Sequence, residues 1–264
     1  MSRPTGDQTV LVSTCPTPTV GWGSPVENPP LSLWQPRPFL GVLAPVPPGR
    51  RARRGVQLLV GLLLYGFTMG LMVRAALGLD PWDVFHQGLT TIIPLSYGTV
   101  ITIVSAVVLL LWIPLRQRPG IGTIANAAII GFTTDATLAV LPEFSDLTVR
   151  IVVLALAIVG NALAGALYIG AGLGPGPRDG LMTGIVGRGI GSIRLVRTTI
   201  ELTVLGIGWV LGGVVGVGTV VYALAIGPLL HLLLPRLEIS SAVAADPDET
   251  VEPNGAPFSE PEGR

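Results

Sequence analysis

Long apolar stretches alternate with short polar segments between residues 50 and 237. A helix needs about 20 residues to cross the hydrocarbon core of a bilayer, because each residue advances it by about 1.5 Å. Apolar stretches of that length lie near residues 55–79, 97–115, 120–142, 150–173, 194–214 and 216–236. The pattern therefore predicts an all-α integral membrane protein with about six transmembrane helices.

Two shorter segments, near residues 81–95 and 177–191, begin with proline and contain polar residues such as His86 and Arg188. They are too short and too polar to span a bilayer as regular helices. Irregular backbone at membrane depth is tolerated where protein surrounds it. We therefore expect two short broken or re-entrant helices.

Arginine placement favours six spans over eight, because cytoplasmic loops carry the excess of basic residues. With six spans and a cytoplasmic N-terminus, the cytoplasmic side receives Arg50, Arg51, Arg53, Arg54, Arg116, Arg118, Arg178, Arg188, Arg194 and Arg236. Arg150 falls outside, with the acidic loop at residues 143–146. Eight spans would move Arg116, Arg118 and Arg178 outside, which is a worse distribution.

The two ends of the chain differ in composition from its middle. Residues 1–49 are rich in Pro, Thr, Ser and Gly, and residues 237–264 are acidic, with Pro and Gly interspersed. Neither composition buries enough apolar area to offset the entropy of ordering. We expect two disordered cytoplasmic tails, at 1–49 and 237–264, around two membrane units, at 50–142 and 143–236.

The membrane region repeats itself at a spacing of 96 residues. Identical residues at this offset include Ala75, Leu77, Gly78, Pro81, Asp83 and Gly88, which recur as Ala171, Leu173, Gly174, Pro177, Asp179 and Gly184. Each copy holds three full spans, so the second copy crosses the bilayer in the opposite sense. Such inverted repeats are typical of secondary transporters, in which interrupted helices build a site. The alternative is that duplication only built a stable bundle.

The strongest local motifs are Leu-Gly-Leu-Asp-Pro-Trp-Asp at 77–83 and Leu-Gly-Pro-Gly-Pro-Arg-Asp at 173–179. Proline suits the first position of a helix, Asp80 suits the cap before it, and Asp83 and Asp179 suit its third position. The N–H groups that begin each short helix are able to bind an anion. Capping alone also explains the carboxylates. In the six-span topology, the two motifs are expected to line opposite ends of one solute pathway.

Other ionisable residues within the spans are also candidates for the pathway, because they are costly in a membrane. Arg178 is expected to hold an anionic group or to pair with Asp179. Arg74 either reaches the interface or lines the pathway. Asp135 aligns with His231 of the second copy, and the two are predicted to relay protons, to bind a cation or to form structural pairs.

Composition excludes several classes of protein. Apolar residues make up 49% of the chain and charged residues 12%, with zero formal net charge. A water-soluble fold and a nucleic-acid partner are therefore not expected. The single cysteine excludes an internal disulfide, and the two histidines form no metal or hydrolase motif. We expect no enzyme activity, no cofactor and no metal. Arg197 and Glu201, four residues apart, are expected to form a structural ion pair.

At these motifs the chain resembles the bacterial YczE-like integral membrane proteins of the YczE/YyaS/YitT grouping. The resemblance covers roughly residues 55–236 and rests on 77–83, on 120–123 followed by Gly131 and Asp135, and on 174–182. It implies a polytopic plasma-membrane protein without implying a defined activity. The Pro-rich segment at 1–49 looks like an addition to the family pattern.

Together these features favour a permease for a small solute in the plasma membrane, with both termini in the cytoplasm. The expected partners are the lipid bilayer and that solute, and a homo-oligomer is left open. The alternative function is a membrane scaffold or regulator that acts through partner proteins. The pathway residues proposed from the sequence are Asp83, Arg178, Asp179, Asp135, Asp80, Arg74 and His231.

Overall fold

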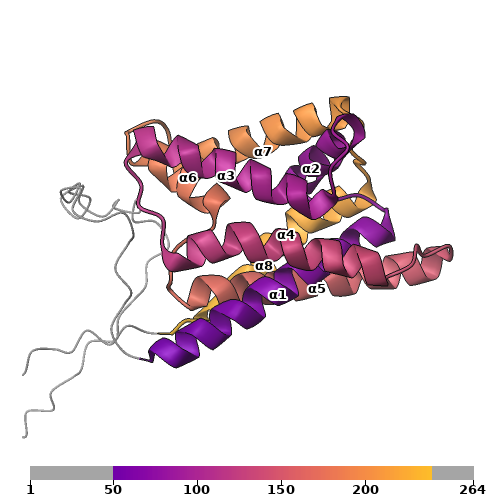
Figure 1. Cartoon of the computed structure of the whole chain (residues 1–264), viewed down its shortest axis with the longest axis horizontal. Helices are drawn as coiled ribbons and strands as arrows, with labels where there is room; N and C mark the ends of the chain where they lie inside the picture. Colours follow the sequence, from indigo (N-terminus) through magenta and orange to yellow (C-terminus); the bar gives the residue numbers. More distant parts are fainter. Residues whose placement is uncertain (1–49, 240–264) are drawn as a thin grey trace, which may run out of the picture. The chain divides into compact units, whose positions relative to one another are not determined.

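The computed structural model describes residues 50–239 as eight α-helices and no strands (Figure 1). The helices are α1 (Arg51–Ala75), α2 (Pro81–Ile92), α3 (Tyr97–Leu115), α4 (Ile121–Val140), α5 (Leu147–Gly170), α6 (Pro177–Val186), α7 (Ile193–Val210) and α8 (Val217–Leu237). The predicted all-α class is confirmed. Residues 1–49 and 240–264, which hold most of the two predicted tails, lie outside the described residues.

Five of these helices are long and apolar enough to cross a membrane, namely α1, α3, α4, α5 and α8. The sixth predicted span corresponds to α7, which has only 18 residues and carries Arg194, Arg197 and Glu201. These three charges reduce its apolar character. The chain is thus a multi-pass membrane protein, and the crossing by α7 stays a prediction.

The helices form two layers in Figure 1. One layer contains α1, α4, α5 and α8, with α1 packed against both α4 and α5 and with α5 packed against α8. The other layer contains α2, α3, α6 and α7, with α2 packed on α7 and α3 on α6. Contacts between α3 and α4 join the layers.

The helices α1 and α5 run antiparallel, as two hydrogen bonds at their ends show. Arg54, near the start of α1, donates from Nη1 to the carbonyl of Ala171 after the end of α5, at 2.8 Å. Arg150, near the start of α5, donates from Nε to the carbonyl of Ala75 at the end of α1, at 2.7 Å. The 96-residue repeat relates these two bonds. Arg54 corresponds to Arg150, and Ala171 corresponds to Ala75.

A second exchanged pair ties the loops before α2 and α6 to the opposite half. The N–H of Gly122 donates to the carbonyl of Leu173 at 2.9 Å, and the N–H of Gly218 donates to the carbonyl of Leu77 at 2.8 Å. These four positions are also related by 96. A bond from the first half to the second thus has an equivalent bond from the second half to the first, as a two-fold axis between the halves would produce. This supports the inverted repeat that the sequence predicts.

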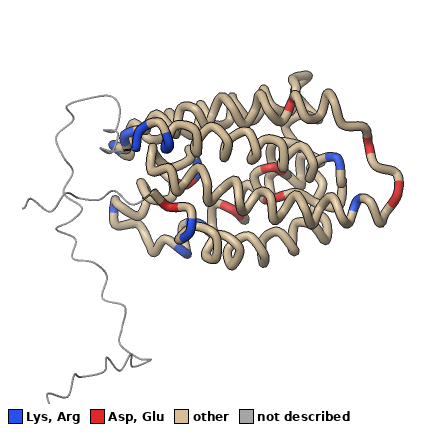
Figure 2. Tube along the Cα trace, turned by 90° about the horizontal axis from the view of Figure 1, so that it is seen from below, with Lys and Arg blue, Asp and Glu red and all other residues tan. Residues whose placement is uncertain are grey.

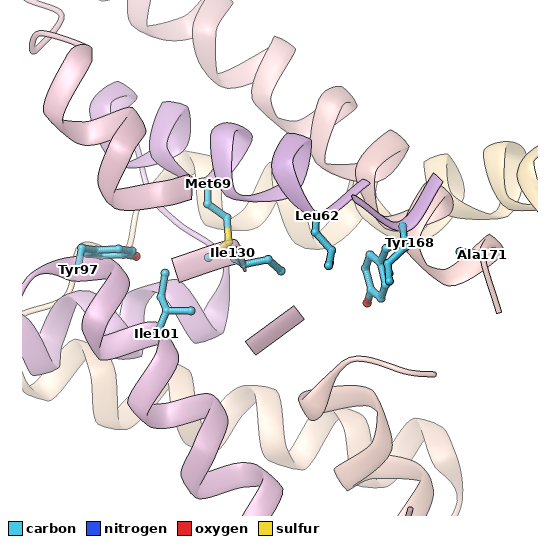
Figure 3. Packing of buried hydrophobic residues seen from close by; sticks show 8 residues of the cluster. Leu62, Met69, Tyr97, Ile101, Ile130, Tyr168 and Ala171 are labelled. Carbon is cyan, nitrogen blue, oxygen red and sulfur yellow. The ribbon is translucent and has the colours of Figure 1, made fainter. Parts of the chain in front are cut away.

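An apolar cluster fills the space between the layers. Leu62 and Met69 of α1, Tyr97 and Ile101 of α3, Ile130 of α4, and Tyr168 and Ala171 at the end of α5 are all buried (Figure 3). Lipid gives no hydrophobic drive between helices, so these side chains hold the layers together through van der Waals packing. This cluster fixes the position of Tyr168, whose hydroxyl reaches the site described below.

Charges are distributed unevenly along the bundle. Figure 2 shows most of the basic residues at one end of the bundle, and an acidic loop at the other end beside further basic residues. The acidic loop contains Glu143 and Asp146, between α4 and α5. The predicted orientation, with the start of α1 in the cytoplasm, depends on this uneven distribution of basic residues.

Candidate functional site

The two short helices begin where the sequence predicts. The helix α2 starts at Pro81, and the carboxylate of Asp80 caps it by accepting the N–H of Asp83 at 2.9 Å. The helix α6 starts at Pro177 after Gly176, which has no side chain with which to cap it. Asp83 and Asp179 therefore occupy the third position of their helices, as predicted.

The starts of α2 and α6 meet inside the bundle. Arg178 Nη1 lies 3.8 Å from Asp80 Oδ1, and the guanidinium lies 5.1 Å from the ring centre of Trp82. The prediction that the two motifs line opposite ends of a pathway is therefore wrong. The segments that precede the two helices pack against the starts of α8 and α4, and they bring both helix starts to one place.

A cavity of about 290 Å³ surrounds these two helix starts, and residues from all eight described helices line it. Its charged lining residues are Asp80, Arg178, Asp179, Arg197 and Glu201, and its neutral polar residues include Tyr65, Ser105, Asn126, Tyr168 and Tyr222. We call this space the polar cavity. Three predicted pathway residues, Asp80, Arg178 and Asp179, lie in its wall.

Asp179 is held by a tyrosine rather than by an arginine. Its Oδ2 accepts a hydrogen bond from the Tyr168 hydroxyl at 3.0 Å. The Tyr168 ring packs edge-on against Tyr65, with 5.9 Å between the ring centres. No ion pair involves Asp179 within residues 50–239. The sequence left open an ion pair between Arg178 and Asp179. In the structure, Arg178 instead pairs with Asp80 of the other half.

The predicted ion pair of Arg197 and Glu201 is confirmed, with 2.9 Å between Nε and Oε1. Both residues line the polar cavity, although the sequence indicated only a structural role for them. Their side chains are 54% and 32% exposed, so these two charges are less buried than Asp80.

Tyr65 and Asn126 of the polar cavity were also missed from the sequence. They align with Asn161 and Tyr222 at the 96-residue offset, so tyrosine and asparagine exchange between the copies. Tyr222 donates to Asn161 Oδ1 at 2.9 Å in one half. The sequence signal that could have identified Tyr65 and Asn126 is a pair of polar positions within the spans at which tyrosine in one repeat corresponds to asparagine in the other.

Asp83 lies outside the polar cavity and is completely buried. Its Oδ1 lies 3.1 Å from Nδ1 of His86, and its backbone carbonyl accepts the Tyr97 hydroxyl at 3.0 Å. The equivalent carboxylate of Asp179 faces the cavity, so the repeat does not preserve the environment of this position. The structure thus separates two residues that the sequence treated alike.

The remaining predicted pathway residues do not line the polar cavity either. Asp135 of α4 caps α3, because its Oδ1 accepts the N–H of Gly98 at 2.7 Å and its Oδ2 accepts the Ser96 hydroxyl. His231 is exposed on α8. Arg74 donates to the carbonyl of Leu138 and lies 3.5 Å from Glu143. The predicted relay between Asp135 and His231 is not assembled in this structure.

The two halves differ at one equivalent interface. Between α3 and α4, Gly98 packs so closely that an added methyl group would overlap the carbonyl oxygen of Gly131. Their counterparts between α7 and α8 are Arg194 and Gly227, and an added methyl group at Gly227 would meet no atom within 4 Å. The α3–α4 side is closed, and the α7–α8 side is loosely packed.

Within residues 50–239, no three His, Cys, Asp or Glu side chains are grouped so as to hold a metal ion. The polar cavity offers arginines, carboxylates, hydroxyls and helix N-termini. These groups bind by hydrogen bonds and charge, and they suit a solute that offers both donors and acceptors.

Comparison with known proteins places these features in a wider group. Residues 52–235 match the model of a family of unknown function, DUF6198. An uncharacterized protein of Haemophilus influenzae (strain ATCC 51907 / DSM 11121 / KW20 / Rd) is 38% identical over 177 residues, which cover 67% of this chain and 81% of the relative.

Two proteins of Bacillus subtilis (strain 168) are also similar. The uncharacterized membrane protein YczE is 35% identical over 178 residues, which cover 67% of this chain and 83% of the relative. The uncharacterized protein YyaS is 25% identical over 183 residues, which cover 68% and 91%. These matches confirm the resemblance seen in the sequence motifs. No solved structure matches the chain.

Proposed function

Since the chain belongs to the DUF6198 family, whose description assigns no activity, we propose from its own geometry that it is a permease for a small polar solute. The observation that supports this most is the polar cavity at the meeting starts of α2 and α6. Interrupted helices from two inverted halves form the substrate sites of many secondary transporters.

The cost of the polar cavity also favours a functional site. Charged groups within a membrane protein are expensive, and apolar residues stabilise a bundle at least as well as buried ion pairs do. The cavity nevertheless contains two arginines and three carboxylates. A chain that needed only a stable bundle would have no reason to keep all five around one cavity.

The difference between the two halves supports alternating access. Asp135 and Gly98 hold α3 against α4, whereas α7 and α8 are loosely packed and the cavity residues Arg197 and Glu201 are partly exposed. In an inverted repeat, these two interfaces lie toward opposite faces of the membrane. We propose that this state is open on the side where α1 begins, which is the cytoplasm of the plasma membrane under the basic-loop rule.

The experiment uses the purified full chain in liposomes. An equimolar mixture of amino acids, amines, organic acids and sugars is added outside, and the vesicle contents are measured by mass spectrometry over time. We expect at least one solute to enter faster than into protein-free liposomes, and Asp179→Asn to abolish the difference. If no solute enters faster, the permease proposal fails.

The scaffold alternative predicts a different dependence on the ends of the chain. A permease whose route is the polar cavity should keep its transport when residues 1–49 and 240–264 are deleted. A scaffold or regulator that recruits partners through those segments should lose its cellular phenotype upon the same deletion. Retained phenotype together with Asp179→Asn inactivity supports transport.

A further inference from the structure

The starts of α2 and α6 differ in how their first turns are capped. At α2, the carboxylate of Asp80 occupies the N-terminus and accepts the N–H of Asp83. At α6, the equivalent position is Gly176, which has no side chain that could cap the helix. The ten residues of α6 therefore begin without the carboxylate that completes α2.

The uncapped start of α6 presents backbone donors beside the polar cavity. The first turn of a helix presents N–H groups that have no partner within the helix, together with the positive end of its dipole. Trp82 lines the polar cavity and is 6% exposed, and its buried Nε1–H has no hydrogen-bond partner among the described residues. Its ring stacks with the guanidinium of Arg178. These groups form a subsite that suits a carboxylate.

An acceptor subsite lies on the same turn of α6. The carboxylate of Asp179 accepts a hydrogen bond from Tyr168, and no arginine or histidine of the described residues forms an ion pair with it within 4 Å. Asp80 and Glu201, by contrast, each lie within 4 Å of an arginine. Among the three cavity carboxylates, Asp179 is thus the one without an ion pair among the described residues, and it is the one that can receive an ammonium group.

The charge of the whole cavity is consistent with a solute that has no net charge. Two arginines oppose three carboxylates in its wall. Each of the two helix starts contributes roughly half a positive charge. The sum is close to zero, so a strongly anionic or cationic solute would leave charge unbalanced in the membrane interior.

From these observations we infer that the solute is a small α-amino acid in its zwitterionic form, an assignment that rests on the proposed permease function. Its carboxylate binds at the start of α6, in the place that Asp80 takes on α2, and its ammonium binds Asp179. The two subsites share one helical turn, which fits charges separated by a single carbon atom. A volume of about 290 Å³ favours a short side chain.

Isothermal titration calorimetry on the full chain in nanodiscs tests the charge pattern. Glycine and L-alanine carry both charges on adjacent groups, 5-aminopentanoate carries them far apart, and acetate and methylammonium carry one each. We expect glycine or alanine to bind at least about tenfold more tightly than the other three probes, as loss of one charge-assisted bond predicts. Equal binding of acetate or methylammonium overturns the inference.

Substitution at Gly176 tests the position of the carboxylate subsite. Gly176→Asp supplies the missing cap from within the chain and should abolish glycine and alanine binding while the protein stays folded. Gly176→Ala is the control, because its methyl group meets the Tyr168 hydroxyl oxygen at 3.3 Å and Asp179 Oδ2 at 3.4 Å, as the Cβ atom of Gly176→Asp also does, but it caps nothing. Unchanged binding in Gly176→Asp, or equal loss in both variants, contradicts the assignment.

Substitution at Asp179 tests the ammonium subsite. Asp179→Asn should weaken binding at least about tenfold, whereas Asp146→Asn, at a cap outside the cavity, should leave binding unchanged. If none of the five probes binds, the amino-acid assignment fails while the liposome experiment still decides whether another solute is carried. The two proposals therefore fail separately.

Discussion

Arg178 of α6 and Asp80 of α2 face each other at 3.8 Å, and this ion pair joins the two halves of the chain. The Asp80 side chain is 4% exposed and the Arg178 side chain 24%. A buried carboxylate whose cation is removed carries a large desolvation penalty. The pair therefore sets the distance between the two short helices that border the polar cavity.

Removing only the cation should damage the protein more than removing both charges. Arg178→Gln leaves Asp80 buried without its arginine, and we expect it to lose on the order of 3 kcal/mol of stability. The double variant Asp80→Asn, Arg178→Gln should recover part of that loss, because asparagine still caps α2. Thermal unfolding in detergent measures both. A double variant less stable than Arg178→Gln would show that the ion pair does not hold α2 and α6 together.

The six-span topology makes a prediction at three loops between α4 and α8. In a Cys15→Ser background, single cysteines at Ser145, Ile190 and Val215 can be labelled in intact cells with a membrane-impermeant maleimide. We expect labelling at residues 145 and 215 only, because α6 returns to the side from which it enters and α7 crosses. Eight spans would place residues 145 and 190 on the same side, and an α7 that does not cross would remove the labelling at 215.

The sequence could predict the local features of the site better than its assembly. Proline and the residues around it fix where α2 and α6 begin, because capping is a matter of a few neighbouring residues. The meeting of Arg178 with Asp80, 98 positions apart, depends on how the two halves pack. No local pattern contains that distance, so the sequence alone places the motifs at opposite ends of a pathway.

The sequence repeat predicted which residues occupy equivalent positions in the two halves, but it did not predict which side chains surround them. Asp83 and Asp179 are equivalent by sequence, yet the first contacts His86 and the second contacts Tyr168. Asp135 is a pathway candidate by sequence because it is ionisable in a span, whereas it caps the neighbouring helix α3. Which polar groups a buried carboxylate meets is decided by side chains from other helices.

Close packing at Gly180 should make that residue intolerant of substitution. An added methyl group would overlap the ring of Trp112, which also donates from Nε1 to the carbonyl of Pro177 at 3.0 Å. We expect Gly180→Ala to cost about 1–3 kcal/mol through overpacking. Gly206→Ala, where no atom lies within 4 Å, should be neutral or stabilising by up to about 1 kcal/mol. Thermal unfolding that shows equal losses would contradict the close approach of α3 and α6.

The cap that Asp135 places on α3 should control access from the closed side. Asp135→Ala removes the acceptor of the Gly98 N–H and should increase maleimide labelling of a cysteine at Thr102, in the α3–α4 interface. Asp146→Ala is the matched control, because it removes a carboxylate cap from α5, where Asp146 accepts the Val149 N–H at 2.9 Å. Both variants should lose about 1 kcal/mol, as removal of a cap does. Equal labelling at Thr102 in both variants would show that Asp135 only stabilises the fold.

Replacement of the two equivalent aspartates, Asp83 and Asp179, by asparagine should have different effects on stability and on binding. The Asp83 carboxylate contacts His86 outside the polar cavity, so Asp83→Asn should lower stability by about 1–3 kcal/mol and leave the binding of glycine and alanine intact. Asp179→Asn should do the reverse, with weak binding and nearly unchanged unfolding, because the Tyr168 hydroxyl can still donate to the amide oxygen. Calorimetry and thermal unfolding of both variants, in the same nanodiscs, give the two readouts. If Asp83→Asn loses the binding of glycine and alanine while it stays folded, and Asp179→Asn keeps that binding, the solute binds behind α2 rather than in the cavity where α2 and α6 meet.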